Sequence, residues 1–101
     1  MRIIVMFDLP VITSDNMKDY RLFRKYLIKA GFMMLQESIY CKLVPNSNVG
    51  DAIVENIKKN RPNDGLVQVL KITEKQFSKM EYIVGVNSSE VLDTDERLVF
   101  L

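Results

Sequence analysis

A short apolar run near the start of the chain constrains the fold more than any other feature. Residues 2–8 read Arg-Ile-Ile-Val-Met-Phe-Asp, and Leu9 and Pro10 end the run. A short series of consecutive apolar residues is typical of a central strand that is covered on both faces. Asp8 lies at the exit of this strand, where its carboxylate can reach solvent while its neighbours stay buried. The pattern therefore predicts one acidic group on a rigid support.

The length and composition fit one small domain. The chain has 101 residues, of which 48% are hydrophobic, so a single core is expected. A domain of this size buries a modest share of its surface and gains stability by forming oligomers. Lysine and arginine number 14 against 13 acidic residues, so binding of nucleic acid depends on how the positive charges cluster.

Missing and rare residue types exclude whole classes of chemistry. The sequence has no histidine, which excludes histidine acid–base catalysis, histidine-ligated zinc and a Ser-His-Asp triad. Cys41 is the single cysteine, so no internal disulfide is expected, in keeping with a reducing compartment such as the cytoplasm. No apolar run approaches the roughly 20 residues of a membrane span, and the opening run is too short for a secretory signal.

Hydrophobic spacing along the rest of the chain predicts alternating helices and strands. The expected elements are, in order, a helix over about 16–30 closed by Gly31, an extended segment over 32–44, a helix over about 48–60, and strands over 66–73 and 82–85. The extended segment is either one bent strand or two short strands broken near 36–38. The spacing of Thr73 and Gln76 is that of a capping box and predicts a single helical turn. Two helices on one face of a mainly antiparallel sheet make an α+β sandwich of ferredoxin-like type.

The C-terminal part of the chain is expected to differ from the rest. Residues 1–85 are expected to form the domain, 86–96 a flexible linker and 97–101 an apolar strand for docking. The docking residues are Arg97, Leu98, Val99, Phe100 and Leu101. An apolar strand on a polar linker can pair with the sheet edge of a second subunit, so we expect a homodimer joined by exchanged tails. The alternative is a tail that folds on its own subunit.

Asp8 has two interpretations. It can be an oxygen ligand of Mg²⁺ or another hard divalent cation, which accepts one or two carboxylates and keeps several waters. A twofold dimer would then supply a second copy of Asp8 across one cleft. Alternatively, it is a strand-end aspartate that bonds the backbone of the following turn.

The helix expected over 16–30 has a row of positive charges on its polar side. The row consists of Lys18, Arg21, Lys25 and Lys29. It extends over roughly 16 Å, which matches several phosphates of duplex DNA. The alternative is an ordinary solvated helix face. Arg24 lies at the edge of the apolar side, where it needs a phosphate or carboxylate partner, or an ion pair within the fold.

Other residues with potential chemistry are expected to be structural. Tyr20, Phe32 and Tyr40 can stack on bases, but their positions favour the core. Ser38 lies in an extended segment without a base to activate it as a nucleophile. Cys41 is expected to be a small buried hydrophobe.

Four segments of the chain form a recognisable set. They are residues 3–10 (IIVMFDLP), 20–27 (YRLFRKYL), 36–40 (QESIY) and 73–77 (TEKQF). In this order and at this length they resemble the CRISPR-associated protein 2 family, closest to the version found beside the type II effector. The resemblance covers essentially the whole chain.

The resemblance implies a ferredoxin-like homodimer whose C-terminal strand packs on the partner subunit. It implies a role in CRISPR adaptation, in which the dimer bridges two dimers of the integrase and supports double-stranded prespacer DNA along a basic surface. It also implies Mg²⁺-dependent endonuclease activity on RNA or DNA, with Asp8 as catalytic residue and metal ligand. The residues that match DNA-backbone contacts of the family are Lys18, Arg21, Arg24 and Lys25.

Overall fold

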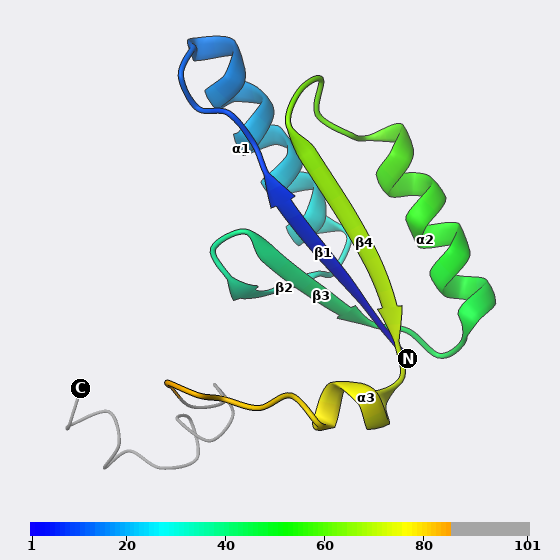
Figure 1. Ribbon diagram of the computed structural model, residues 1–101. Helices are drawn as coiled ribbons and strands as arrows, with labels where there is room; N and C mark the ends of the chain where they lie inside the picture. The colour runs from blue at the N-terminus through cyan, green and yellow to red at the C-terminus, as the bar shows by residue number, and fades with distance from the viewer. Residues whose placement is uncertain (86–101) are drawn as a thin grey trace.

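A four-stranded antiparallel sheet organises residues 1–85, which are the residues that the computed structural model describes (Figure 1). The elements are β1 (Arg2–Asp8), α1 (Ser14–Lys29), β2 (Met33–Gln36), β3 (Ile39–Leu43), α2 (Ser47–Lys59), β4 (Leu66–Ile72) and α3 (Glu74–Ser78). The strand order is β2-β3-β1-β4, and every neighbouring pair is antiparallel. The predicted ferredoxin-like α+β sandwich with a central first strand is therefore confirmed.

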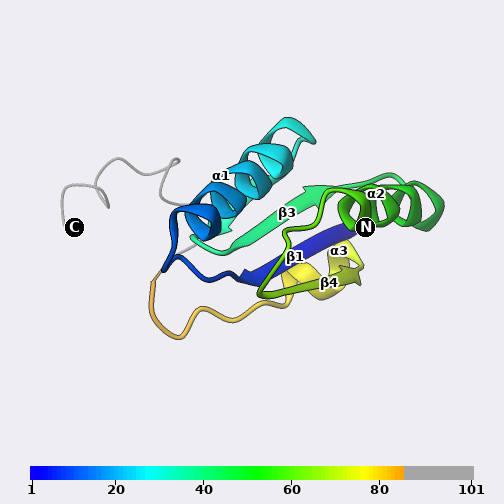
Figure 2. The ribbon, with the colours of Figure 1, turned by 90° about the horizontal axis from the view of Figure 1, so that it is seen from above.

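The core lies between the sheet and the two long helices. Figure 2 shows α1 and α2 on the same side of the strands. Alternate residues of β1 point to this side because successive side chains of a strand face opposite ways. The buried cluster consists of Ile3, Val5, Phe7, Phe23, Leu27, Phe32, Tyr40, Val44 and Ile57. The predicted core positions of Phe32 and Tyr40 are thus confirmed, whereas Tyr20 is half-buried at the margin of the cluster.

The ends of α1 follow from local hydrogen bonds. The Thr13 hydroxyl accepts a bond from the Asn16 amide at 3.1 Å, and the Asn16 side chain accepts one from the Thr13 amide at 3.3 Å. This capping box starts α1 at Ser14, two residues before the predicted start. Gly31 follows the helix with φ of 93°, which confirms its predicted role as the stop.

The extended segment predicted over 32–44 forms two short strands, which was one of the two predicted alternatives. β2 and β3 pair with each other, and an irregularity between Met34 and Gln36 shifts their register.

The strand predicted over 82–85 is wrong. Ile83 and Val84 are 88% and 90% exposed, and this segment has no neighbouring strand within residues 1–85. Strand propensity alone does not form a strand when no partner accepts its hydrogen bonds. The linker and tail predicted over 86–101 lie outside the described residues.

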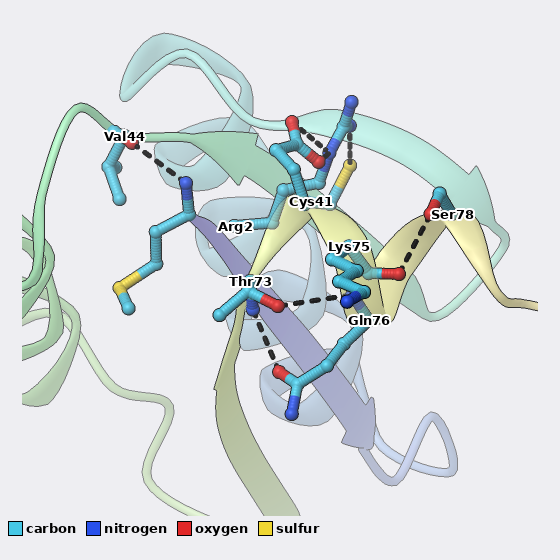
Figure 3. A network of polar contacts seen from close by, with 9 residues as sticks. Arg2, Cys41, Val44, Thr73, Lys75, Gln76 and Ser78 are labelled. Atoms are coloured by element: carbon cyan, nitrogen blue, oxygen red, sulfur yellow. Dashed lines mark hydrogen bonds and ion pairs between the residues drawn. The ribbon is translucent and has the colours of Figure 1, made fainter.

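Arg2 contacts α3 on the face of the sheet that lies opposite to α1 and α2. Arg2 alternates with the buried Ile3, so its side chain points away from α1 and α2. Its Nε donates to the Glu74 carboxylate at 2.8 Å, and its guanidinium lies 4.1 Å from the centre of the Phe77 ring. Figure 3 shows the same guanidinium beside Cys41, whose buried sulfur accepts a bond at 3.7 Å. The bond to Glu74 raises the pKa of Arg2. The predicted helical turn and the burial of Cys41 are both confirmed.

Part of this second face is open. Leu43, Leu66 and Leu70 are 59%, 55% and 51% exposed, and each pairs with a β1 residue that points to this face. The prediction that β1 is covered on both faces is confirmed for most of the strand, since Ile4 on this face is 7% exposed and only Asp8 at the end of β1 is exposed. In the described part of the chain, no helix has the length and apolar character needed to cross a membrane.

Candidate functional site

Asp8 is the last residue of β1, and its side chain is exposed. The backbone at this position is held by pairing with Leu66 of β4. The hydrogen bonds and ion pairs within residues 1–85 include none from the Asp8 carboxylate. The alternative in which Asp8 bonds the following turn is therefore wrong, and neither carboxylate oxygen has a partner within residues 1–85.

Gly65 fixes the exit of β1 on which Asp8 lies. Its φ is 93°, and a Cβ atom added here would lie 2.7 Å from the Asp8 carbonyl oxygen and 2.9 Å from a methyl group of Leu9. A side chain at position 65 is excluded both by this backbone conformation and by the close contact. The loop before β4 therefore packs closely against the backbone of Asp8.

Asp8 lines a hollow of about 420 Å³ at the end of the sheet, which we call the Asp8 hollow. The turn between β2 and β3 forms one wall, and the start of β4 forms another. The polar side chains that line it besides Asp8 are Gln36, Glu37, Ser38 and Gln68. These side chains offer oxygen ligands without sulfur or imidazole, a donor set that suits hard cations such as Mg²⁺.

The Asp8 hollow supplies only part of a metal site. No group of three metal-binding side chains of the His, Cys, Asp and Glu types comes together within residues 1–85. Asp8 and Glu37 are the carboxylates among the residues that line the hollow. A Mg²⁺ site with one or two protein carboxylates fits this set, because this ion keeps several waters and uses phosphate oxygens of its substrate.

A second and larger hollow, which we call the α1–β2 groove, lies between α1 and the edge strand β2. Its volume is about 750 Å³. The groove is lined by Tyr20, Arg21, Arg24, Lys25, Ile28, Lys29, Met34 and Glu37. It thus brings together three of the predicted DNA-binding residues with Lys29 of the basic row. Lys18 is exposed on the same helix but does not line the groove.

Arg24 is held in place by the core. Its Nε donates to the hydroxyl of Tyr40 at 2.9 Å, and the Tyr40 side chain is 0% exposed. The predicted alternative of an ion pair within the fold is wrong for the described residues, because the partner is a neutral phenol. Arg24 itself is exposed, so its other N–H groups remain available for an anion.

Sequence reasoning missed the position of Glu37. This residue lines both the Asp8 hollow and the α1–β2 groove, so the two adjoin at the turn between β2 and β3. The sequence had placed a break near 36–38, and an acidic residue within that break was the available signal. The apolar groove residues Ile28 and Met34 were also missed, because helical spacing and strand alternation do not show which exposed side chains meet.

Comparisons with known proteins identify the family. A family model described as CRISPR associated protein Cas2 matches residues 1–80 of the chain. The chain belongs to the Cas2 family. A relative named CRISPR-associated endoribonuclease Cas2 from Treponema denticola is 59% identical over the full length of both chains. A relative of the same name from Streptococcus mutans is 44% identical over all of this chain and 93% of its own length. The predicted family is thereby confirmed.

A solved structure of a Cas2 protein has the same fold. The crystal structure of Streptococcus pyogenes Cas2 at pH 6.5 matches with a TM-score of 0.60, over 83% of this chain and 100% of that chain. The identity is 15%, so this similarity concerns the fold alone. It agrees with the ferredoxin-like arrangement of the described elements.

Proposed function

We propose that this Cas2-family chain is a metal-dependent endoribonuclease of CRISPR systems that cleaves phosphodiester bonds at Asp8. The main support is the Asp8 carboxylate, which is exposed, has no side-chain partner in the part of the chain that the structure describes, and lies at a strand end near a groove lined with cations. The relatives from Treponema denticola and Streptococcus mutans are named endoribonucleases, which supports RNA as the substrate. DNA is the alternative substrate.

The residues of the two hollows have distinct parts in this proposal. Asp8, together with Glu37 of the same hollow, would coordinate Mg²⁺ or another divalent cation through carboxylate oxygens. Such an ion supplies positive charge for the phosphoryl oxygens and activates water. Arg21, Arg24 and Lys25 bind backbone phosphates and place the scissile bond near Asp8, since charge-assisted bonds to phosphate are strong and directional.

A homodimer is part of the proposal, because one chain supplies one strand-end aspartate. The open face of the sheet offers exposed apolar side chains at Leu66 and Leu70, and Leu66 is the register partner of Asp8. A second copy packed on this face would cover these leucines and bring its own Asp8 to the same side. We further propose that residues 97–101 of each chain pair with the sheet edge of the other.

We also propose a second function, as a subunit of CRISPR adaptation. The exposed cations of α1 favour it, because they offer non-specific, salt-sensitive contacts to a DNA backbone. In this role the dimer bridges two integrase dimers and supports double-stranded prespacer DNA through Lys18, Arg21, Arg24 and Lys25. This proposal also places the protein in the cytoplasm, in keeping with the free thiol of Cys41.

Asp8→Asn tests the catalytic proposal. The purified variant is incubated with a labelled RNA in Mg²⁺ or in EDTA, and cleavage is followed on a denaturing gel. We expect the wild type to cleave in Mg²⁺ only, and the variant to lose at least about a hundredfold in rate, as when a transition-state contact is removed. The control is Asp15→Asn, which removes an exposed carboxylate outside both hollows. Cleavage by Asp8→Asn at the wild-type rate would refute the role of Asp8.

The adaptation role has a separate test. Prespacer duplex is mixed with the protein, with and without integrase, and the complexes are separated by size-exclusion chromatography. We expect Asp8→Asn to assemble normally and a chain lacking residues 97–101 to fail. If the shortened chain still forms the full complex, the docking role of the tail is wrong.

A further inference from the structure

We propose that Gln68 of β4 is a further ligand of the cation in the Asp8 hollow and holds the ion from the side opposite to the turn between β2 and β3. This inference rests on the proposed endoribonuclease function and adds a residue to its site. The sequence alone does not point to Gln68, because glutamine carries no charge and its neighbours depend on the register of the sheet.

Gln68 lies on the same face of the sheet as Asp8 and one register pair away. Asp8 pairs with Leu66, and Met6 pairs with Gln68, on the neighbouring strands β1 and β4 (Figure 1). Because side chains of a strand alternate between the two faces, these four side chains share one face. Diagonal neighbours of this kind are roughly 7–8 Å apart, which a long side chain can bridge. The Gln68 amide lines the Asp8 hollow and can therefore reach a ligand held by Asp8.

Gln68 is the polar member of an otherwise apolar row. The β4 residues that face this side are Leu66, Gln68, Leu70 and Ile72. The side-chain hydrogen bonds within residues 1–85 include none from the Gln68 amide. A second copy packed on this face would take the amide out of water, where a polar group needs another partner. The occupant of the Asp8 hollow is such a partner.

The chemistry of an amide suits this position. Carbonyl oxygens, like carboxylates and water, are ligands for hard cations such as Mg²⁺ and Mn²⁺. Asp8 enters the hollow from β1 and Glu37 from the turn, whereas β4 contributes Leu66 and Gln68. Gln68 is therefore the residue through which β4 can hold the ion. A neutral oxygen does so without a third negative charge, which would repel the phosphate of a substrate.

An ordinary exposed glutamine is the alternative, and one substitution separates the two. Gln68→Leu continues the apolar row on β4. If Gln68 is only a surface residue, this change leaves cation binding as it was. If Gln68 is a ligand, the same change removes an oxygen from the hollow and weakens the binding of the ion.

The test measures cation binding without substrate. Mn²⁺, a paramagnetic substitute for Mg²⁺, is titrated into the full-length protein, and electron paramagnetic resonance reports the ion left free. The variants are Gln68→Leu, Gln68→Glu and a transposed variant that combines Gln68→Leu with Leu70→Gln. The transposed variant keeps the composition of the face but moves the amide beside Ile4, two residues further from Asp8. Leu70→Gln alone is its control, and Asp8→Asn is the reference for loss of the site.

We expect Gln68→Leu to weaken Mn²⁺ binding about tenfold, as when a group that supports a metal site is removed. The transposed variant should bind as weakly, and Leu70→Gln should bind as the wild type does. Gln68→Glu should tighten binding about tenfold, because a further carboxylate raises the affinity for a hard cation. In the Asp8→Asn background, Gln68→Glu should restore part of the lost binding. Cleavage of RNA by Gln68→Leu should need about tenfold more Mg²⁺ for half of the maximal rate.

Unchanged Mn²⁺ binding in Gln68→Leu, together with lost binding in Asp8→Asn, would overturn this inference and leave the endoribonuclease proposal intact. Full binding in Asp8→Asn, or none in the wild type, would refute the cation site and both proposals with it. If Gln68→Leu does not fold by circular dichroism, Gln68→Glu decides, and binding no tighter than that of the wild type would overturn the assignment.

Sedimentation velocity guards against an indirect effect. A Gln68→Leu chain that loses both the ion and a wild-type dimer would place Gln68 in the interface between copies and overturn its role as a ligand. A wild type that binds Mn²⁺ through Gln68 but cleaves no RNA would refute the endoribonuclease proposal and leave the ligand assignment standing.

Discussion

At the scale of single residues, Tyr40 shows how the core serves an exposed site. Its ring stacks on Phe7 with 5.7 Å between centroids and is fully buried, while its hydroxyl reaches Arg24 at 2.9 Å. The close packing of the interior fixes the ring, so the hydroxyl cannot follow a mobile arginine. The arginine is instead held at one position of the α1–β2 groove.

Tyr40→Phe tests this arrangement. The change removes the acceptor of the Arg24 bond and leaves the ring in place. We expect the free energy of unfolding to fall by about 0.5–1 kcal/mol, the lower part of the range for one hydrogen bond, because Arg24 is exposed and regains water. Equilibrium unfolding in urea measures this change in the free energy of unfolding. The control is Tyr26→Phe. Tyr26 packs against the core from α1, the helix that carries Arg24, and lies outside the groove. Equal losses in both variants would contradict a special role of the Tyr40 hydroxyl.

Some of the site was predictable from the sequence and some was not. Asp8 was, because a carboxylate that directly follows an apolar strand must leave the core at its end. The bond between Arg24 and Tyr40 was not, because it depends on the position of α1 over β3. Glu37 was placed in a break but not in a site, since a turn residue gains its neighbours only when the sheet has formed.

At the scale of elements, two capping boxes of the same chemistry start very different helices. Thr13 caps α1, which buries Phe23 and Leu27, whereas Thr73 caps α3, in which no residue is buried. Burial, rather than the cap, ties a helix to the cooperative fold. α3 depends on its cap and on the contacts of Glu74 and Phe77 with Arg2.

Alanine in place of each capping threonine should separate these two situations. We expect Thr13→Ala to lower the free energy of unfolding by about 1 kcal/mol, because α1 unfolds only with the whole domain. Thr73→Ala should lower it by less than about 0.5 kcal/mol, because α3 can fray alone. Hydrogen exchange should instead quicken at the amides of Phe77 and Lys79, which donate within α3. Unchanged exchange at these amides in Thr73→Ala would show that Arg2, not the cap, forms the helix.

Local signals predicted the elements wherever their hydrogen bonds are local. Both long helices were placed within two residues of their observed bounds, because periodicity and caps are properties of the sequence itself. The segment 82–85 was misassigned because its residues favour strands but no strand lies beside it in the described chain. Strand formation depends on a neighbour, and a sequence does not show where that neighbour lies.

At the scale of the whole molecule, the unequal faces of the sheet are the main consequence of the fold. One face has two long helices and a buried cluster, while the other has α3 near Arg2 and exposed leucines beside the buried Ile4 and Cys41. An exposed apolar face of this kind in an 11.7 kDa chain favours association, because a small domain gains most by burying further apolar surface. The register that pairs Asp8 with Leu66 and Ile4 with Leu70 places this face and the acidic site on the same side.

Leu70→Glu tests whether a second copy covers that face. Leu70 is 51% exposed, and its change to a charged residue costs a monomer little but would bury an unpaired carboxylate in a dimer interface. We expect sedimentation velocity to show the wild type at twice 11.7 kDa and the variant at 11.7 kDa. The control is Ile12→Glu, because Ile12 is 89% exposed in the loop before α1. If Leu70→Glu remains a dimer, the interface lies elsewhere. If it becomes a folded monomer that cleaves RNA as fast as the wild type, one Asp8 is sufficient and the proposed pairing of two is wrong.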